Sequence, residues 1–198
     1  MVIAYHLILT AYGFWLPNDP RGSWSTFVRS FALYRAGGPA TKTETPRSVA
    51  NVKHDRAARE LAKTALKYPP VTFNGEQARE VMRGIGDYVE KNRRPVHAAA
   101  VMPDHVHLLA GCCEHDVETV ADQLKERATT FLNRAGINPM KPFANRRGRI
   151  PTPWARGQWV VYLNDVDDID RVTGYIESNP VKAGHKPQRY SWIVPFTE

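Results

Sequence analysis

Two histidines separated by one residue are the most distinctive side chains in this sequence. His105 and His107 lie in the segment 102–109, directly after a Pro-Asp turn and within an apolar stretch. Alternate residues of a strand point to the same face, so the two imidazoles face the same way, about 7 Å apart along the backbone. Imidazole binds divalent cations at about 2 Å, so the pair can hold one ion. The spacing therefore predicts a metal site on a strand, with two surface histidines as the alternative interpretation.

A second pair of side chains lies near the C-terminal end, in the segment 174–184. Tyr175 and Asn179 are four residues apart, so on a helix they share one face. They lie at the edge of an apolar stripe, where a side chain is anchored and still reaches outward. A phenol can act as a nucleophile, and a carboxamide oxygen can bind a cation. Taken alone, the pair is more typical of a tyrosine at the core margin and an asparagine that caps a helix.

Periodicity in the apolar residues indicates the elements that would position these side chains. The predicted elements are strands over 2–11, 96–102, 105–112 and 158–163, and helices over about 52–67, 76–92, 116–134 and 167–179. This is the βαββαβ order of a ferredoxin-like α+β fold with an added terminal helix. We therefore expect an antiparallel sheet with helices on one face.

The chain length of 198 residues fits a single domain over 1–198, and no linker suggests a second one. A long loop is predicted at about 12–50, where glycine and proline recur, and a C-terminal helix and tail at about 166–198. The loop contains Trp15 and Arg21. Aromatic and basic side chains together can stack and bind single-stranded bases, although packing of the tryptophan onto the domain is the alternative.

The charge balance favours a polyanionic partner. Lys and Arg number 27 against 20 Asp and Glu, a net charge of +7. Arg146, Arg147 and Arg149 cluster in a loop-like segment where they can contact phosphates, or simply form a solvated turn. No apolar run approaches the roughly 20 residues that span a bilayer, and no basic segment precedes the apolar start as in a signal peptide. We expect a cytoplasmic protein without membrane contact, and the adjacent Cys112 and Cys113 fit a reducing compartment.

Together the two motifs resemble the REP-associated tyrosine transposases, which belong to the single-tyrosine HUH, or IS200-like, transposases. The matching residues are His105-Val-His107 behind Met-Pro-Asp, and Tyr175-Ile-Glu-Ser-Asn179-Pro-Val-Lys-Ala-Gly. Lesser matches are Leu124-Lys125-Glu-Arg127, Trp154 and Trp159, and the segment 12–22. They occur in the family's order over nearly the whole chain, whereas the run Val160-Val161-Tyr162 after Trp159 departs from many relatives.

The resemblance implies an HUH-type endonuclease fold and a metal-dependent tyrosine DNA endonuclease and strand transferase. His105, His107 and Asn179 would bind one Mg²⁺ or Mn²⁺. Tyr175 would attack the scissile phosphate of single-stranded DNA near a REP-like hairpin and form a 5′-phosphotyrosine that allows rejoining. The expected DNA-binding residues are Lys125, Arg127, Arg146, Arg147, Arg149, Arg21 and Trp15.

Several alternatives stay open from the sequence. The protein could bind hairpin DNA without cleaving it, or be a zinc hydrolase that adds His97 or His115 to the histidine pair. A replication initiator or relaxase shares the His-x-His pattern, but those proteins are usually larger. Tyr162 is a rival nucleophile on a predicted strand. A monomer and a homodimer are equally compatible with the sequence, and the DNA target cannot be read from it.

Overall fold

The computed structural model describes residues 1–14, 16, 19, 28, 30–42, 55–112 and 116–197. The chain forms two compact units, one from Met1–Ala11 and Thr72–Glu198, the other from Tyr12–Val71. Whether they fold as the single predicted domain stays a prediction, because a compact unit need not fold independently.

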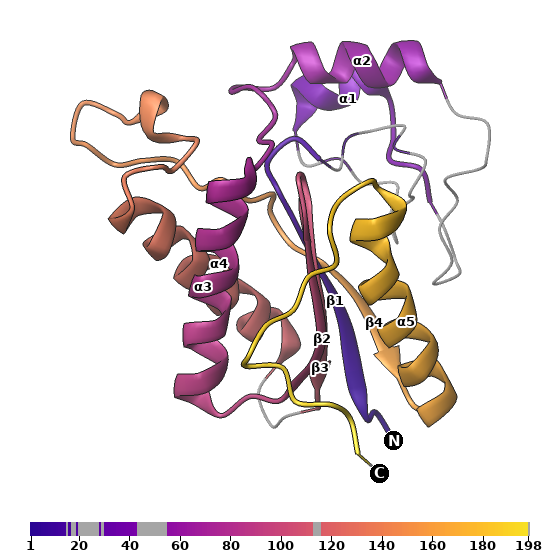
Figure 1. Ribbon diagram of the computed structural model, residues 1–198. Coiled ribbons are helices and arrows are strands. Elements are labelled where there is room, and N and C mark those ends of the chain that lie inside the picture. The colour runs from indigo at the N-terminus through magenta and orange to yellow at the C-terminus, as the bar shows by residue number, and fades with distance from the viewer. Residues whose placement is uncertain are drawn as a thin grey trace. The chain divides into compact units, whose positions relative to one another are not determined.

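The first unit is built on one four-stranded antiparallel sheet (Figure 1). Its strands are β1 (Ala4–Thr10), β2 (Val96–Met102), β3 (His105–Gly111) and β4 (Trp159–Leu163). They lie in the order β2-β3-β1-β4, with every neighbouring pair antiparallel. The two strands that start the two halves of the βαββαβ unit, β1 and β3, are therefore central. The predicted α+β fold with a ferredoxin-like antiparallel sheet is confirmed.

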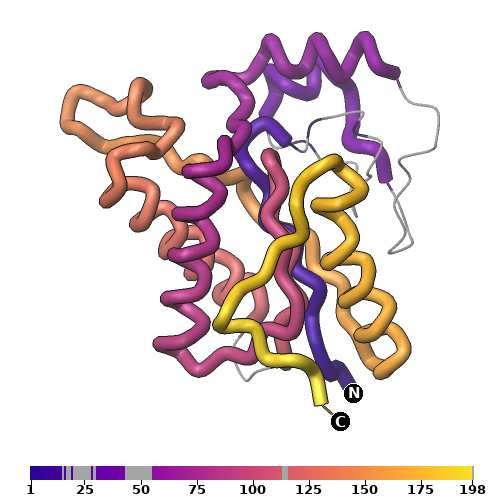
Figure 2. Tube along the Cα trace, viewed as in Figure 1, coloured from indigo at the N-terminus to yellow at the C-terminus, as the bar shows by residue number. Residues whose placement is uncertain are grey.

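Helices cover both faces of this sheet (Figures 1 and 2). α3 (Gly75–Asn92) and α4 (Val117–Arg134) contact each other and lie on the face that bears Tyr5 and Leu7. α5 (Val166–Lys182) lies on the other face, where Ile169 and Ile176 pack against Ala4 and Leu109. The two helices of the βαββαβ unit share one face as predicted, and the terminal helix closes the opposite face.

Local sequence explains where these helices begin. Asn74 and Gln77 form a capping box at the start of α3, and Asp116 and Asp165 cap α4 and α5. The last helix, predicted over about 167–179, extends further, because α5 includes Pro180 and continues to Lys182. A proline removes one N–H donor and crowds the preceding turn, but near a helix end few hydrogen bonds are affected.

The C-terminal tail runs along the outer edge of β2. The Gln188 side chain donates to the Val101 carbonyl and accepts from the Val101 N–H, both at 2.8 Å, and the Val194 N–H donates to the Val96 carbonyl at 3.0 Å. Trp192 packs on Gly86 of α3, where a Cβ would lie 2.4 Å from the indole nitrogen. The tail therefore covers backbone groups that an edge strand would otherwise expose.

The second unit contains two helices in contact, α1 (Phe31–Gly37) and α2 (Arg56–Thr64). α1 lies inside the segment predicted as a loop at about 12–50, so that part of the loop prediction is wrong. Ser30 caps this short helix and Gly38, with φ of 73°, ends it. None of the helices in the described part of the chain is long and apolar enough to cross a membrane.

Candidate active site

β3 carries the two predicted histidines on the face that α5 covers. His105 and His107 share this face with Leu109, which packs in the core beneath α5. Their Nε2 atoms lie 2.9 Å apart. His107 is buried and His105 is partly exposed, so the pair lies at the boundary between core and solvent.

Both imidazoles are oriented through their other ring nitrogen. Nδ1 of His105 lies 2.7 Å from the Asp104 carboxylate, and Nδ1 of His107 lies 2.9 Å from Nε2 of His6. Such contacts behind a histidine are typical of metal ligands. If each nitrogen lies about 2.1 Å from the ion and the nitrogen–ion–nitrogen angle is about 90°, the two nitrogens are about 3 Å apart. The separation of the two Nε2 atoms therefore fits a shared divalent cation.

His6 is a component of the site that the sequence analysis missed. It lies on β1 opposite Leu109, which turns its ring to the same face as His107, and it is buried. Burial lowers the pKa of His6 to about 4, and the charges of Arg171 and His105 act in the same direction. Burial also lowers the pKa of His107 well below its ordinary value. Both rings are therefore neutral near pH 7, the form in which imidazole binds metal.

α5 places Tyr175 against these rings. The Tyr175 ring centroid lies 5.5 Å from that of His107 and 6.0 Å from that of His6, both in edge-to-face geometry. The residue is 46% exposed. The structure thus brings a solvent-accessible phenol to the histidine pair.

Asn179 lies one helical turn beyond Tyr175 and is half-buried. Strand pairing places the start of α5 near the Gly111 end of β3, so the helix runs toward His105. Asn179 therefore lies further toward the His105 end of the sheet than Tyr175. Its role as a ligand stays a prediction.

Three further arginines lie on an exposed turn, which we call the arginine turn (residues 145–149). The Asn145 side chain accepts from the Arg147 and Arg149 N–H groups at 2.9 and 3.0 Å, and the backbone closes between Asn145 and Arg149. Arg146, Arg147 and Arg149 are all exposed, so the predicted loop is confirmed and their DNA contacts stay a prediction.

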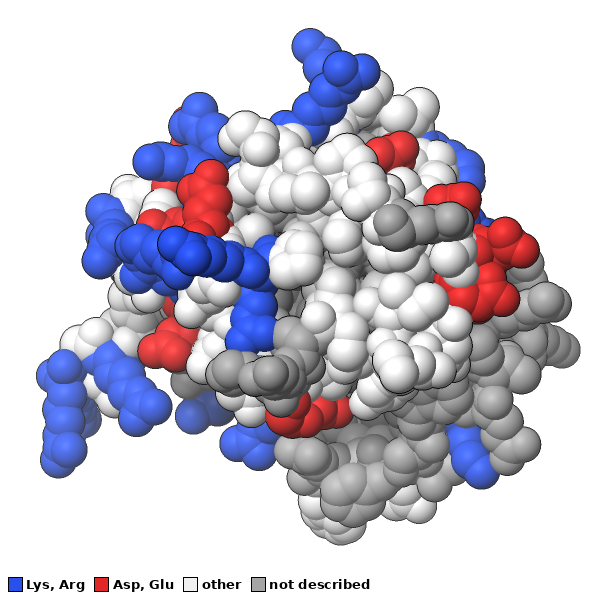
Figure 3. Space-filling model, turned by 90° about the horizontal axis from the view of Figure 1, so that it is seen from below, with Lys and Arg blue, Asp and Glu red and all other residues white. Residues whose placement is uncertain are grey.

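On the face drawn in Figure 3, Lys and Arg gather toward the side on which α3 and α4 lie.

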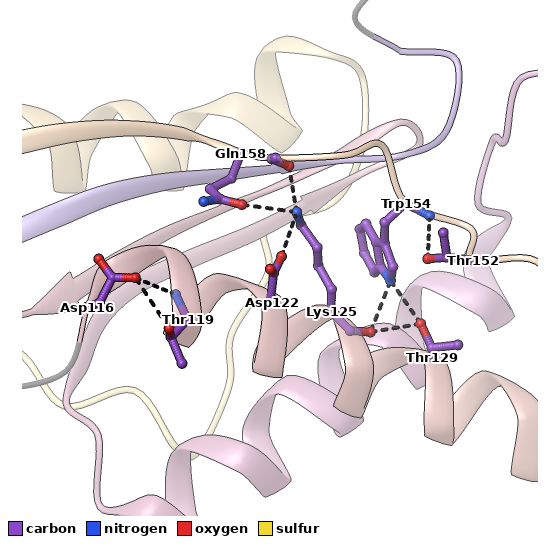
Figure 4. Close-up of polar contacts among 9 residues, drawn as sticks. Asp116, Thr119, Asp122, Lys125, Thr129, Thr152, Trp154 and Gln158 are labelled. Atoms are coloured by element: carbon purple, nitrogen blue, oxygen red, sulfur yellow. Dashed lines mark hydrogen bonds and ion pairs between the residues drawn. The ribbon is translucent and has the colours of Figure 1, made fainter. Parts of the chain in front are cut away.

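Lys125 lies away from the histidines, on α4 and on the opposite face of the sheet. Its ammonium donates to the Gly157 carbonyl at 2.5 Å and to Gln158 at 3.2 Å (Figure 4). Burial lowers the pKa of Lys125, and Asp122 partly opposes that shift. Lys125, one of the expected DNA-binding residues, thus holds the segment before β4, and its contact with DNA stays a prediction.

Arg127, also on α4, donates to the Asp87 carboxylate of α3 and lies over the Phe131 ring at 5.4 Å. This ion pair raises the pKa of Arg127 and lowers that of Asp87. A DNA contact through Arg127 would compete with the link between the two helices. The predicted DNA-binding residues Trp15 and Arg21 lie outside the described residues.

The alternative nucleophile and the alternative zinc ligand lie away from the histidine pair. Tyr162 is opposite Tyr5 on the sheet and contacts its ring at 5.6 Å, which places it on the face away from Tyr175. His97 lies beside Gly111, at the far end of β3 from His105, and binds the Val194 carbonyl at 2.8 Å. The alternative in which His97 is a third zinc ligand is therefore wrong. Among the residues that the structure describes, no three His, Cys, Asp or Glu side chains form a metal-binding group, and His115 lies outside them.

The chain is similar to known transposases. A REP-associated tyrosine transposase bound to a REP hairpin is similar in structure, with 20% identity, a TM-score of 0.42, and coverage of 56% of this chain and 58% of that one. A candidate transposase from Deinococcus radiodurans has 14% identity and a TM-score of 0.40, with coverage of 93% and 92%. No curated protein sequence matches. The model of the family "Transposase IS200 like" matches residues 64–179, more than half of the chain. The chain therefore belongs to the IS200-like transposase family.

Proposed function

We propose that this protein is a metal-dependent endonuclease and strand transferase for single-stranded DNA, with Tyr175 as the nucleophile. The observation that carries the proposal is the edge-to-face contact of Tyr175 with His107, at 5.5 Å, beside the paired Nε2 atoms of His105 and His107. We assign the third ligand to Asn179, which follows Tyr175 by four residues and so shares its face of α5. A transposase must break and rejoin phosphodiesters, and this cluster contains a nucleophile and cation ligands together.

Each group has a defined part in the reaction. A divalent cation, Mg²⁺ or Mn²⁺, would polarise the scissile phosphate and offset charge in the transition state. The Tyr175 oxygen, after losing its proton, attacks phosphorus, and the bond from phosphorus to the 3′ oxygen breaks. The products are a 5′-phosphotyrosine and a 3′ oxygen, which takes up a proton. The reverse attack by a 3′-OH rejoins a strand without another energy source.

A basic cleft at the histidine end of the sheet supports single-stranded DNA as the substrate. Its volume is about 510 Å³, and Arg79, Lys186 and Arg189 are among its lining residues. Met102, which also lines it, is paired with His105 across the β2–β3 hairpin. A flexible strand bound in this cleft would lie close to the ion ligands, and the arginine turn would contact a hairpin stem by its phosphates.

The test is cleavage of labelled single-stranded DNA that carries a hairpin, in the presence of Mn²⁺. Wild type and Tyr162→Phe are expected to cleave and form a covalent protein–DNA adduct, whereas Tyr175→Phe is expected to do neither. Tyr162 is a matched control because it is a similarly exposed tyrosine on the other face of the sheet. Cleavage that persists in Tyr175→Phe would overturn the proposal. Tight binding without any cleavage would instead identify a hairpin-binding protein.

A further inference from the structure

We infer that His6 is a positioning residue that sets which nitrogen His107 presents to the cation, an inference that rests on the proposed function. His6 is buried on β1, and its Nε2 lies 2.9 Å from Nδ1 of His107. The two rings are 5.1 Å apart and tilted by 31°. A histidine in an otherwise apolar strand costs stability unless its nitrogens are paired, and this contact supplies one partner.

Cation binding by His107 fixes the roles of its two ring nitrogens. Nε2 of His107 faces Nε2 of His105 and must offer a lone pair, so the ring proton of the imidazole lies on Nδ1. Nδ1 then donates to Nε2 of His6, which accepts, and His6 carries its own proton on Nδ1. An ammonium in the place of His6 could not accept this hydrogen bond.

Two substitutions separate this role from simple packing. His6 also contacts the Tyr175 ring edge-to-face at 6.0 Å. His6→Phe keeps a ring for that contact but can neither donate nor accept. His6→Gln loses the ring and keeps a carboxamide that can do both. His97→Phe is the control, since His97 lies at the far end of the sheet and binds a backbone carbonyl.

The experiment combines ¹⁵N NMR of the imidazoles, with and without Mg²⁺, and Mn²⁺ dissociation constants from electron paramagnetic resonance. In the Mg²⁺-saturated protein we expect the ring protons of His107 and His6 on their Nδ1 atoms, with Nε2 of His6 as the acceptor. His6→Phe should bind Mn²⁺ about 10- to 100-fold more weakly, in the range seen when groups behind a ligand are removed. His6→Gln should recover part of the loss, and His97→Phe should match wild type.

A proton on Nε2 of His6 in Mg²⁺-saturated wild type, or a folded His6→Phe that binds Mn²⁺ as tightly as wild type, would overturn the inference. The wild-type spectra decide the question even where His6→Phe does not fold. Failure of the proposed function looks different. A wild type that takes up no Mn²⁺ removes the metal site itself, whereas DNA cleavage by Tyr175→Phe removes the nucleophile and leaves the role of His6 intact.

Discussion

Removal of the three side chains of the arginine turn should weaken hairpin binding in a salt-dependent way. Arg146, Arg147 and Arg149 are exposed on a turn that Asn145 holds through two backbone N–H groups. The backbone is thus ordered before DNA arrives, and substitution of all three by Ala removes charge without breaking these backbone contacts. We expect weaker binding to every hairpin sequence, because phosphate contacts carry no base information.

The size of the effect follows from counterion release. Each phosphate neutralised on duplex DNA contributes about −0.9 to the slope of log K against log salt concentration, so three contacts contribute about −2.7. Between 50 and 200 mM salt the logarithm of concentration rises by about 0.6. Wild type should therefore lose about 40-fold more affinity over this range than the variant.

Fluorescence anisotropy with a labelled hairpin at several salt concentrations measures both slopes. The control variant replaces Arg83, Lys91 and Arg134 by Ala, three exposed basic residues on α3 and α4, and lowers the net charge by the same amount. A triple variant of the arginine turn with the wild-type slope would refute the reasoning. An equal change of slope in the control would show that overall charge, and not this turn, determines binding.

Three further substitutions test the packing of the first unit by urea denaturation. Lys125→Met should lower the free energy of unfolding by about 1–3 kcal/mol, because the Gly157 carbonyl loses its donor, and should leave DNA affinity unchanged. Gly84→Ala should lower it by about 1–3 kcal/mol, because the Cβ would meet the α4 backbone at 2.7 Å, whereas Gly75→Ala, with open space, should not lower it. Burial raises the pKa of Tyr190 above 10, so the native state keeps a proton that the unfolded state loses, and stability should fall by up to about 1.4 kcal/mol per pH unit above pH 10. Tyr190→Phe should lack this loss of stability above pH 10. An equal dependence of the free energy of unfolding on pH in both proteins would contradict the prediction.

The parts of the site that lie within one element could be predicted from the sequence. The two-residue period of a strand places His105 and His107 on one face, and the helical period does the same for Tyr175 and Asn179. The order of elements also predicted the ferredoxin-like sheet. These inferences need only local geometry, which the sequence pattern specifies.

The missing parts depend on how elements meet. His6 joins the site because β1 pairs with β3 in a register that sets it opposite Leu109, and one sequence does not specify that register. Its only signal was a histidine within an apolar strand. The burial of Lys125 was missed for a similar reason: charged residues on helices are usually exposed, and only the fold shows that this ammonium reaches the Gly157 carbonyl. The short helix α1 was missed because glycine and proline surround it.

The most direct measurement is peptide mapping of the covalent adduct that forms when wild-type protein is incubated with hairpin-bearing single-stranded DNA and Mn²⁺. After nuclease and protease digestion, mass spectrometry locates the residue that retains a nucleotide. The phenol beside His107 leads us to expect the nucleotide on Tyr175, joined through a 5′ phosphate. A nucleotide on Tyr162 or on any other residue would contradict the account, as would DNA cleavage with no protein-bound nucleotide at all.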